Sequence, residues 1–317
     1  MKIAVLNYPH AILSSVHGPY DMFSQVNGMV SAFRPDIKIP TLDVSILLSN
    51  QVMETDKFDL VIIPAMQFAE IESVIASNQH LIPWLHQQYQ QGCEIASVCM
   101  GAFLLAESGL LNNSSATTHW LGAGIFKEKY PQVKLVDDKF ITDFQRIYTS
   151  GGAFSFTSLI IYLMDKYFGN EVAILMSKVF LVHIHDSKQS GYKILGLQKN
   201  HKNKAIQEIQ NYIEEHIEEQ FPVEEIAAKA HMSLRTFMRN FKKATGDTPN
   251  AYIQKVRVEK AKKLLEGGAK SIEEISIQVG YNDFASFRKT FKKTVGLNPS
   301  EYKKLYNRVF SEVNVEH

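Results

Sequence analysis

The first 200 residues alternate short apolar runs with longer amphipathic stretches, a pattern typical of strands followed by helices. The apolar runs predict strands at Ile3–Leu6, Val44–Leu47, Leu60–Ile63 and Ile95–Val98. The amphipathic stretches predict helices at Pro19–Ala32, Leu81–Gln91, Ala102–Ser108, Phe154–Phe168 and Val172–His183, and Lys134–Tyr148 predicts a further strand or hairpin. Repeated strand–helix alternation favours a parallel sheet flanked by helices. We therefore expect an α/β parallel-sheet sandwich, flavodoxin-like, over residues 1–185.

The last third of the chain has helical periodicity and repeats itself. Five residues, Phe237, Phe241, Gly246, Pro249 and Tyr252, recur 50 positions later as Phe287, Phe291, Gly296, Pro299 and Tyr302. Upstream the offset is 49, so the second copy has one residue inserted at 279–282. Each copy predicts an amphipathic helix, a short turn and a second helix that begins at a Ser or Asp cap, which is a helix-turn-helix unit.

The second helix of each copy separates apolar from basic positions. Leu234, Phe237 and Phe241 in the first copy, and Phe284, Phe287 and Phe291 in the second, predict a buried stripe. Arginines and lysines occupy other faces, which indicates a surface for a polyanion; a merely solvated basic face is the alternative. The helix between the copies, about 25 Å long, can hold two such helices roughly one DNA turn, near 34 Å, apart.

Residues 205–308 resemble the AraC/XylS DNA-binding domain, with GYNDFASFRKTF at 280–291 and GLNPSEY at 296–302 as the most specific segments. The resemblance implies that exposed positions of each second helix touch base edges. The matching positions are Arg235, Thr236 and Arg239 in the first copy and Ala285, Ser286, Arg288 and Lys289 in the second. Arg can pair with guanine, Ser and Thr with several bases, and Ala with a thymine methyl. Lys243 and Lys293 are expected at phosphates, where contacts add affinity without sequence information.

Charge is distributed unevenly along a chain whose net charge is only +1. Residues 1–200 carry 14 Lys and Arg against 17 Asp and Glu, whereas residues 229–308 carry 18 against 7. This asymmetry assigns the nucleic-acid partner to the C-terminal third. Two cysteines suggest no disulfide framework. No apolar run approaches the roughly 18–20 residues of a membrane span, and the chain opens on a strand, so we expect a cytoplasmic protein, bacterial by its type.

One segment of the first 200 residues carries candidate chemistry. Cys99 ends the apolar strand 95–98 and directly precedes a helix, and Gly101 allows a sharp turn there. This arrangement is that of a nucleophile elbow, with backbone N–H groups available to an anion, and a helix N-terminus lowers the pKa of a thiol. The spacing alone favours a buried and inert cysteine over a reactive one.

Residues 1–185 resemble the PfpI-like, class I glutamine amidotransferase-like superfamily, and more narrowly the amidase-like sensor domain fused to AraC-type DNA-binding domains. The resemblance is strongest at 94–120 and 142–152. It implies a nucleophilic cysteine, matched by Cys99, and a histidine partner, matched by His119 beside Trp120. The resemblance also implies an acidic third member, often an Asp three residues before a Gly-Pro pair. Here the pair is Gly18-Pro19 and the position three residues before it is Ser15, so this acid is missing. Asp21, after the pair, is expected in a helical first turn for structural reasons.

Without an activating carboxylate, a nucleophile loses its usual help. We therefore expect a ligand pocket formed by Ser15, Cys99, Met100, His119 and Trp120 that binds without turnover, with Cys99 and His119 as vestiges of catalysis. Three alternatives stay open: a Cys99-dependent amidase or hydratase, a thiol redox sensor, and a purely structural or dimerising domain. No cofactor is expected.

Three lesser features have plain explanations. His183, His185 and Asp186 lack a further spaced ligand, so we expect no metal there. Trp84 is expected to pack in the core, and so is Cys93.

These patterns together predict a sequence-specific DNA-binding transcription regulator. The expected domains are a sensor at 1–185, a linker at 186–203, a double helix-turn-helix domain at 204–308 and a tail at 309–317. The expected partners are double-stranded promoter DNA, a small-molecule effector and a second copy of the chain, with RNA polymerase as a further candidate.

Overall fold

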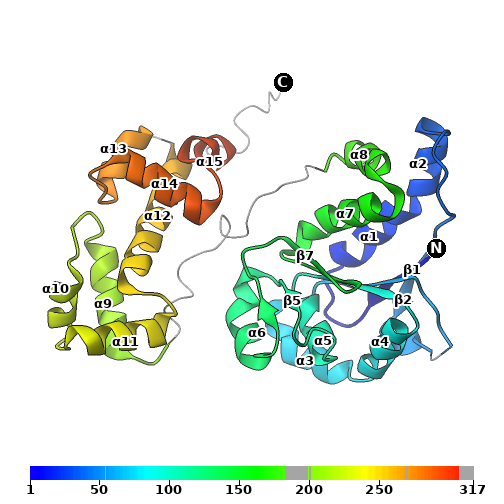
Figure 1. Cartoon of the computed structure of the whole chain (residues 1–317), viewed down its shortest axis with the longest axis horizontal. Coiled ribbons are helices and arrows are strands. Elements are labelled where there is room, and N and C mark those ends of the chain that lie inside the picture. The colour runs from blue at the N-terminus through cyan, green and yellow to red at the C-terminus, as the bar shows by residue number, and fades with distance from the viewer. Residues whose placement is uncertain (54, 183–198, 200, 269, 307–317) are drawn as a thin grey trace, which may run out of the picture. The chain divides into compact units, whose positions relative to one another are not determined.

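The computed structural model describes residues 1–53, 55–182, 199, 201–268 and 270–306. The chain divides into two compact units, Met1–Gln189 and Ser190–His317 (Figure 1). Of the predicted linker, 186–203, only residues 199 and 201–203 are described, and the predicted tail lies outside the described residues. Each unit is considered by itself below.

The N-terminal unit is built on a six-stranded sheet of order β2-β1-β3-β4-β8-β7. All neighbouring pairs are parallel except β7 and β8. The strands are β1 (Lys2–Asn7), β2 (Asp43–Leu48), β3 (Leu60–Ile63), β4 (Glu94–Val98), β7 (Ile141–Phe144) and β8 (Ile147–Ser150). A separate parallel pair joins β5 (Ser115–Ala116) and β6 (Lys134–Leu135). The predicted parallel α/β fold is confirmed.

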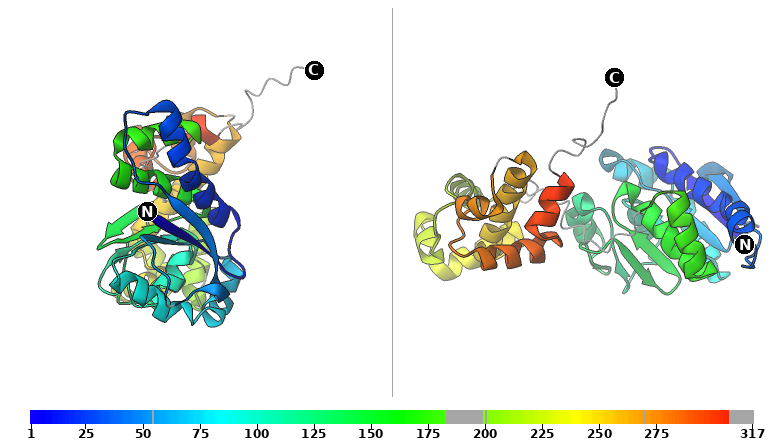
Figure 2. Two further views of the ribbon diagram at one scale, coloured as in Figure 1. Left: turned by 90° about the vertical axis from the view of Figure 1, so that its right-hand side faces the viewer. Right: turned by 90° about the horizontal axis from the view of Figure 1, so that it is seen from above.

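Helices cover both faces of this sheet (Figures 1 and 2). One layer contains α1 (Ser14–Ser24), α2 (Val26–Phe33), α7 (Phe156–Phe168) and α8 (Asn170–Val179). The other contains α3 (Ile71–Ser77), α4 (Leu81–Gln90), α5 (Gly101–Glu107) and α6 (Ala123–Lys129). Short 3₁₀ helices lie at η1 (Ser49–Gln51), η2 (Phe68–Glu70), η3 (Trp120–Gly122) and η4 (Ala153–Ser155). The apolar strands β1, β3 and β4 lie between the two layers, which explains their continuous hydrophobic runs.

Several predicted bounds are corrected by the structure. The helix expected from Pro19 begins at Ser14 and keeps Pro19 inside it, and a break at Gln25 separates α1 from α2. Asp21 therefore lies beyond the first turn of its helix, and the dipole explanation given for it is wrong. α8 ends at Val179, four residues before the predicted end.

The predicted hairpin is β7–β8, and it extends to Ser150. Its two turn residues, Gln145 and Arg146, both have positive φ, 49° and 63°. This backbone conformation matches the tight turns whose twist suits a β-hairpin.

The C-terminal unit is entirely helical in its described part. Its helices are α9 (Lys204–Glu215), α10 (Val223–Lys229), α11 (Leu234–Thr245), α12 (Pro249–Gly267), α13 (Ile272–Gln278), α14 (Phe284–Val295) and α15 (Pro299–Tyr306). One core gathers around Phe237, Phe241 and Tyr252, and a second around Phe287, Phe291 and Tyr302. Helix α12 contributes to both cores, so it ends the first repeat and begins the second.

The turn that carries the inserted residue of the second repeat docks against the first repeat. Gln220 donates a hydrogen bond to the Gly280 carbonyl at 3.1 Å. Arg257 of α12 donates to the Ile217 and Glu219 carbonyls and lies over the Tyr281 ring. A Cβ at Gly280 would come within 2.6 Å of the Ile217 carbonyl oxygen. Glycine is therefore required where the two repeats meet, and this joint fixes their relative orientation.

Candidate functional site

The two repeats form helix-turn-helix units of closely matching internal geometry. The ring centroids of Phe237 and Phe241 are 5.4 Å apart, against 5.6 Å for Phe287 and Phe291. Phe241 meets Tyr252 edge-on at 5.4 Å, and Phe291 meets Tyr302 edge-on at 5.5 Å. The residues that recur in the sequence thus build the same core twice.

The same tyrosines also bond to equivalent acids. The Tyr252 hydroxyl donates to Glu214 of α9 at 2.9 Å, and the Tyr302 hydroxyl donates to Glu266 of α12 at 2.6 Å. Each structural repeat therefore includes the helix before its helix-turn-helix, which extends the repeat beyond the matching letters of the sequence.

Side-chain caps begin both second helices. The Ser233 hydroxyl accepts from Thr236 N at the start of α11, and the Asp283 carboxylate accepts from Ala285 N and Ser286 N at the start of α14. A hydrogen bond with the Ser286 side chain, together with these two backbone bonds, holds the pKa of Asp283 below its usual range. Helices α11 and α14 both end at a glycine in the left-handed region, Gly246 and Gly296. Local sequence thus fixes both ends of each predicted recognition helix.

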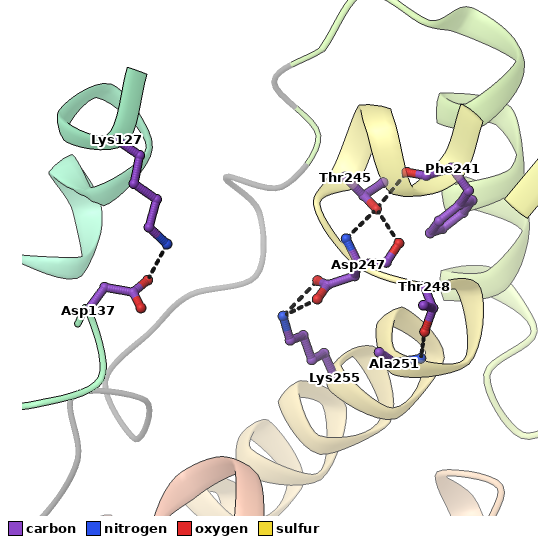
Figure 3. Close-up of polar contacts among 8 residues, drawn as sticks. All are labelled: Lys127, Asp137, Phe241, Thr245, Asp247, Thr248, Ala251 and Lys255. Carbon is purple, nitrogen blue, oxygen red and sulfur yellow. Dashed lines mark hydrogen bonds and ion pairs between the residues drawn. The ribbon is translucent and has the colours of Figure 1, made fainter. Parts of the chain in front are cut away.

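Figure 3 shows how the turn after α11 is held. The Thr245 hydroxyl donates to the Phe241 carbonyl and accepts from Asp247 N, and Thr248 caps α12 at Ala251 N. Lys255 binds both Asp247 carboxylate oxygens, at 2.7 and 2.6 Å. This lysine is therefore committed to an internal ion pair. Figure 3 also draws an ion pair in the N-terminal unit, Lys127 to Asp137 at 3.5 Å.

The predicted DNA-contacting side chains of α11 are mostly exposed. Arg235, Arg239 and Lys243 are exposed, and in the described part of the chain none of them forms an ion pair or hydrogen bond. Thr236 is half-buried, and its hydroxyl bonds to Ser233 at 3.0 Å, which gives it a capping role as well.

The corresponding set on α14 is exposed throughout. It comprises Ala285, Ser286, Arg288, Lys289 and Lys293. The Arg288 guanidinium lies 5.9 Å from the centroid of the Phe284 ring.

Two features of α11 differ from the prediction. Leu234 was expected in the buried stripe, but it is 41% exposed. It occupies the first position of α11; Phe284, which was also expected in a buried stripe, is the first residue of α14 and is half-buried. The sequence reasoning also missed Met238, which is 37% exposed on α11. In the 50-residue offset between the repeats, Met238 corresponds to Arg288, an expected DNA-contacting residue. This correspondence could have identified Met238 as an exposed position.

The backbone around Cys99 has the predicted elbow. Cys99 follows β4 with φ 55°, an uncommon conformation for a residue with a side chain. Its N–H donates to the Ser150 carbonyl at 2.7 Å, and its carbonyl accepts from the Thr118 hydroxyl at 2.9 Å. A Cβ at Gly101 would come within 2.3 Å of the Pro64 carbonyl oxygen. Glycine is therefore required for the close approach of the elbow to the end of β3.

Burial opposes the acidic thiol that a helix N-terminus favours at this elbow. Cys99 is only 3% exposed, and burial raises the pKa of its thiol to about 12, although the Met100 N–H opposes part of the shift. The hydroxyl of Tyr8 is buried close by, and burial together with Cys99 raises the pKa of Tyr8. Desolvation by this packing outweighs the helix N-terminus.

His119 is half-buried, and its side chain caps the short helix η3. Its Nδ1 accepts a hydrogen bond from Leu121 N at 3.1 Å and caps η3. Burial lowers the pKa of His119, so the ring is neutral near pH 7 and carries its proton on Nε2. No hydrogen bond joins His119 to Cys99, both of which lie in the described region. The ring therefore has no free lone pair with which to accept a thiol proton.

Ser15, where an acid was expected, has a structural role. It is fully buried, donates to the Ile12 carbonyl at 2.7 Å and accepts from Ala65 N at 2.9 Å. It therefore holds the start of α1 against the segment that follows β3.

The remaining pocket candidates differ in exposure. Met100 is buried, whereas Trp120 is half-buried with its ring 5.3 Å from that of His119. Trp84 packs in the core and donates to the Met53 carbonyl, and Cys93 is a buried core residue, both as predicted.

Two further kinds of site were sought among the described residues. They contain no group of three or more His, Cys, Asp or Glu side chains that could hold a metal ion. His183, His185 and Asp186 lie outside those residues. No described helix is both long and apolar enough to cross a membrane.

Comparison with known proteins assigns a family to each unit. Residues 17–165 match the DJ-1/PfpI family, and residues 226–305 match a helix-turn-helix domain family. A crystal structure of a transcriptional-regulator candidate from Vibrio parahaemolyticus superposes with a TM-score of 0.50 and 18% identity, covering 56% of this chain and 98% of that one. That likeness supports the fold of the N-terminal unit.

Curated relatives share both units. The HTH-type transcriptional regulator CdhR of Pseudomonas aeruginosa is 26% identical over 234 residues, which cover 74% of this chain and 69% of CdhR. GbdR of the same species is 26% identical over 69% of this chain and 60% of its own length. GlxA of Rhizobium meliloti is 27% identical over 67% of this chain and 66% of its own length. The chain therefore combines a DJ-1/PfpI domain with an AraC-type helix-turn-helix domain, and the curated relatives to which it is similar are HTH-type transcriptional regulators.

Proposed function

We propose that this regulator reads promoter DNA through α11 and α14 and that its N-terminal unit binds a small-molecule effector without turnover. One observation carries the DNA-binding part. Two helix-turn-helix units with nearly the same core present exposed cations that form no ion pair within the described residues, on the second helix of each unit. A shared helix and a buried joint connect the two units, so they can engage DNA as one rigid reader.

We assign contacts according to chemistry and exposure. Arg235 and Arg239 of α11 and Arg288 and Lys289 of α14 would bind base edges, because guanine offers two acceptors to such donors. The other proposed base contacts, which are neutral, are Thr236, Ala285 and Ser286. Lys243 and Lys293, nearer the helix ends, would neutralise phosphates.

The length of α12 supports simultaneous engagement of two grooves. Its 19 residues span about 28.5 Å at 1.5 Å per residue. Recognition helices at its two ends can therefore lie in major grooves about one turn apart on one face of DNA.

The N-terminal unit lacks the parts of a working nucleophile, which supports binding without turnover. Cys99 has a neutral, buried thiol, the acceptor nitrogen of His119 is occupied, and both polar functions of Ser15 are used internally. The half-buried pair His119 and Trp120 offers an N–H donor beside an aromatic surface. A carbonyl-bearing or anionic metabolite with an apolar part suits this pair.

Assembly and location are part of the same proposal. We propose a homodimer formed through the N-terminal unit, where Leu13 and Phe154 are exposed apolar side chains near the contact of α1 with η4. Because the proposed ligand is promoter DNA, we propose that the protein acts in the cytoplasm, with RNA polymerase as a candidate partner.

The test of DNA reading is selection from a library of random duplexes with the full chain. The expected result is an enriched motif with two half-sites per chain, separated by about one helical turn. Enrichment of no motif, with equal affinity for all duplexes, would contradict the proposal.

A further inference from the structure

Exposed apolar side chains in the C-terminal unit gather on the first recognition helix. Among the described residues of that unit, the exposed large apolar side chains are Leu234, Met238 and Ile277. Two of these three lie on α11, one turn apart, although α11 buries Phe237 and Phe241 completely. Exposed apolar groups on a basic helix require an explanation, because a solvated helix face is normally polar.

Helical geometry places this apolar pair beside the arginines. With 3.6 residues per turn, Met238 lies about 40° around the helix axis from Leu234, and Arg235 lies about 60° further on. Leu234 and Met238 thus form a strip between the buried phenylalanines and the exposed arginines. A surface that binds base edges through Arg235 and Arg239 would bring this strip to the floor of the same groove.

The second helix-turn-helix unit differs at the two corresponding positions. In the 50-residue offset between the repeats, Phe284 corresponds to Leu234 and Arg288 corresponds to Met238. Phe284 is half-buried, 6.3 Å from the Phe287 ring, and Arg288 lies over it. Helix α14 therefore presents a guanidinium where α11 presents a thioether, and the two half-sites must differ at the bases that these positions meet.

We propose that Met238, with Leu234 beside it, makes α11 select thymine through its C5-methyl group. This inference rests on the proposed reading of DNA by α11. The thymine methyl is the one apolar group on the major-groove edges of the four bases. A methionine side chain is flexible and polarisable, which suits contact with such a group. The surrounding Arg235, Arg239 and Lys243 match the charge of DNA, which favours DNA over a protein as the occupant.

The test replaces thymine by deoxyuracil, which lacks only the methyl group. The full chain is used with its selected duplex, and each thymine is changed singly while affinity is measured at constant salt. One or two changes in the α11 half-site should lower affinity about fourfold each, the factor expected for one buried methyl-sized group. Deoxyuracil in the α14 half-site should have no effect at the base facing Arg288.

Variants connect the effect to the side chain. In Met238→Ala the thymine and deoxyuracil duplexes should bind equally, and in Met238→Arg the base preference should move toward guanine. Ile277→Ala, which removes an even more exposed apolar side chain outside the recognition helices, is the control and should keep the methyl sensitivity.

Three outcomes separate the possibilities. Selective binding without methyl sensitivity in either half-site, or sensitivity that survives Met238→Ala, overturns the inference and leaves DNA reading intact. Absence of any selected motif contradicts the proposed function itself. Unchanged DNA affinity of Met238→Ala together with lost transcription by RNA polymerase also overturns the inference, because the strip would then bind protein.

Discussion

Replacement of Arg239 by alanine should weaken binding to the selected site and abolish preference at one base pair. Arg239 is exposed and has no partner within the described residues, so the change removes no internal contact and the fold should persist. A bidentate arginine–guanine contact provides about 1–3 kcal/mol of discrimination. That range corresponds to a loss of about 5- to 150-fold in affinity for the selected site.

Lys243 lies one turn further along α11 and provides the matched comparison. Lys243→Ala should weaken specific and random duplexes by the same factor, because phosphates carry no sequence information. The slope of log affinity against log salt should become shallower by about 0.9, the value for one phosphate contact. Fluorescence anisotropy with both duplexes over a salt series measures both effects.

The two variants must differ in kind as well as in size. The assignment of the reading face would be refuted if Arg239→Ala weakened random and selected duplexes equally. It would also fail if the salt slope changed more in Arg239→Ala than in Lys243→Ala.

Four further predictions concern the N-terminal unit and the duplicated core. With a thiol pKa of about 12, Cys99 should resist alkylation by iodoacetamide between pH 7 and 9, and Cys99→Ser should keep the effector response. Rapid alkylation of Cys99, or a covalent adduct on Cys99 together with a lost response in Cys99→Ser, would favour an enzyme or a redox sensor. His119→Ala should abolish effector response in a reporter assay without changing basal DNA binding. Burial lowers the pKa of His119 from its usual value of 6.5, so the unfolded chain binds this proton more readily than the folded chain. The wild type should therefore lose stability below about pH 6.5 more steeply than His119→Gln. Parallel curves of unfolding free energy against pH for the two proteins would contradict this. Tyr252→Phe and Tyr302→Phe should each lower the free energy of unfolding by about 1 kcal/mol in urea titrations, and very different losses would contradict the equivalence of the two cores.

The double helix-turn-helix could be predicted in detail because its signals are local. Caps at Ser233 and Asp283, glycines after both second helices and phenylalanines at helical spacing all lie within a few residues of what they determine. The exposure of Leu234 and Met238 was not foreseen, because an apolar residue on a helix is ordinarily assigned to the core.

The sensor unit was predicted correctly in type and less well in its details. Strands β1, β3 and β4 were found because buried parallel strands are continuous apolar runs. Helix α1 was placed too late because a proline usually begins a helix, whereas Pro19 lies inside one. The short helices α3 and α6, of seven residues each, were missed.

The chemistry of Cys99 illustrates a different limit. Its position after a strand and before a helix is legible in the sequence. The pKa of its thiol depends on desolvation by segments far away in the chain, among them the segment of Tyr8, and no local pattern encodes that burial.

The most direct test of the two-helix reading of DNA is a hydroxyl-radical footprint of the full chain on its selected site. Each bound chain should protect two segments on one face of the duplex, centred about 10 base pairs apart. Arg239→Ala should weaken protection in one segment and Lys289→Ala in the other. A single protected segment, or two segments on opposite faces of the duplex, would contradict the claim that α11 and α14 read DNA together.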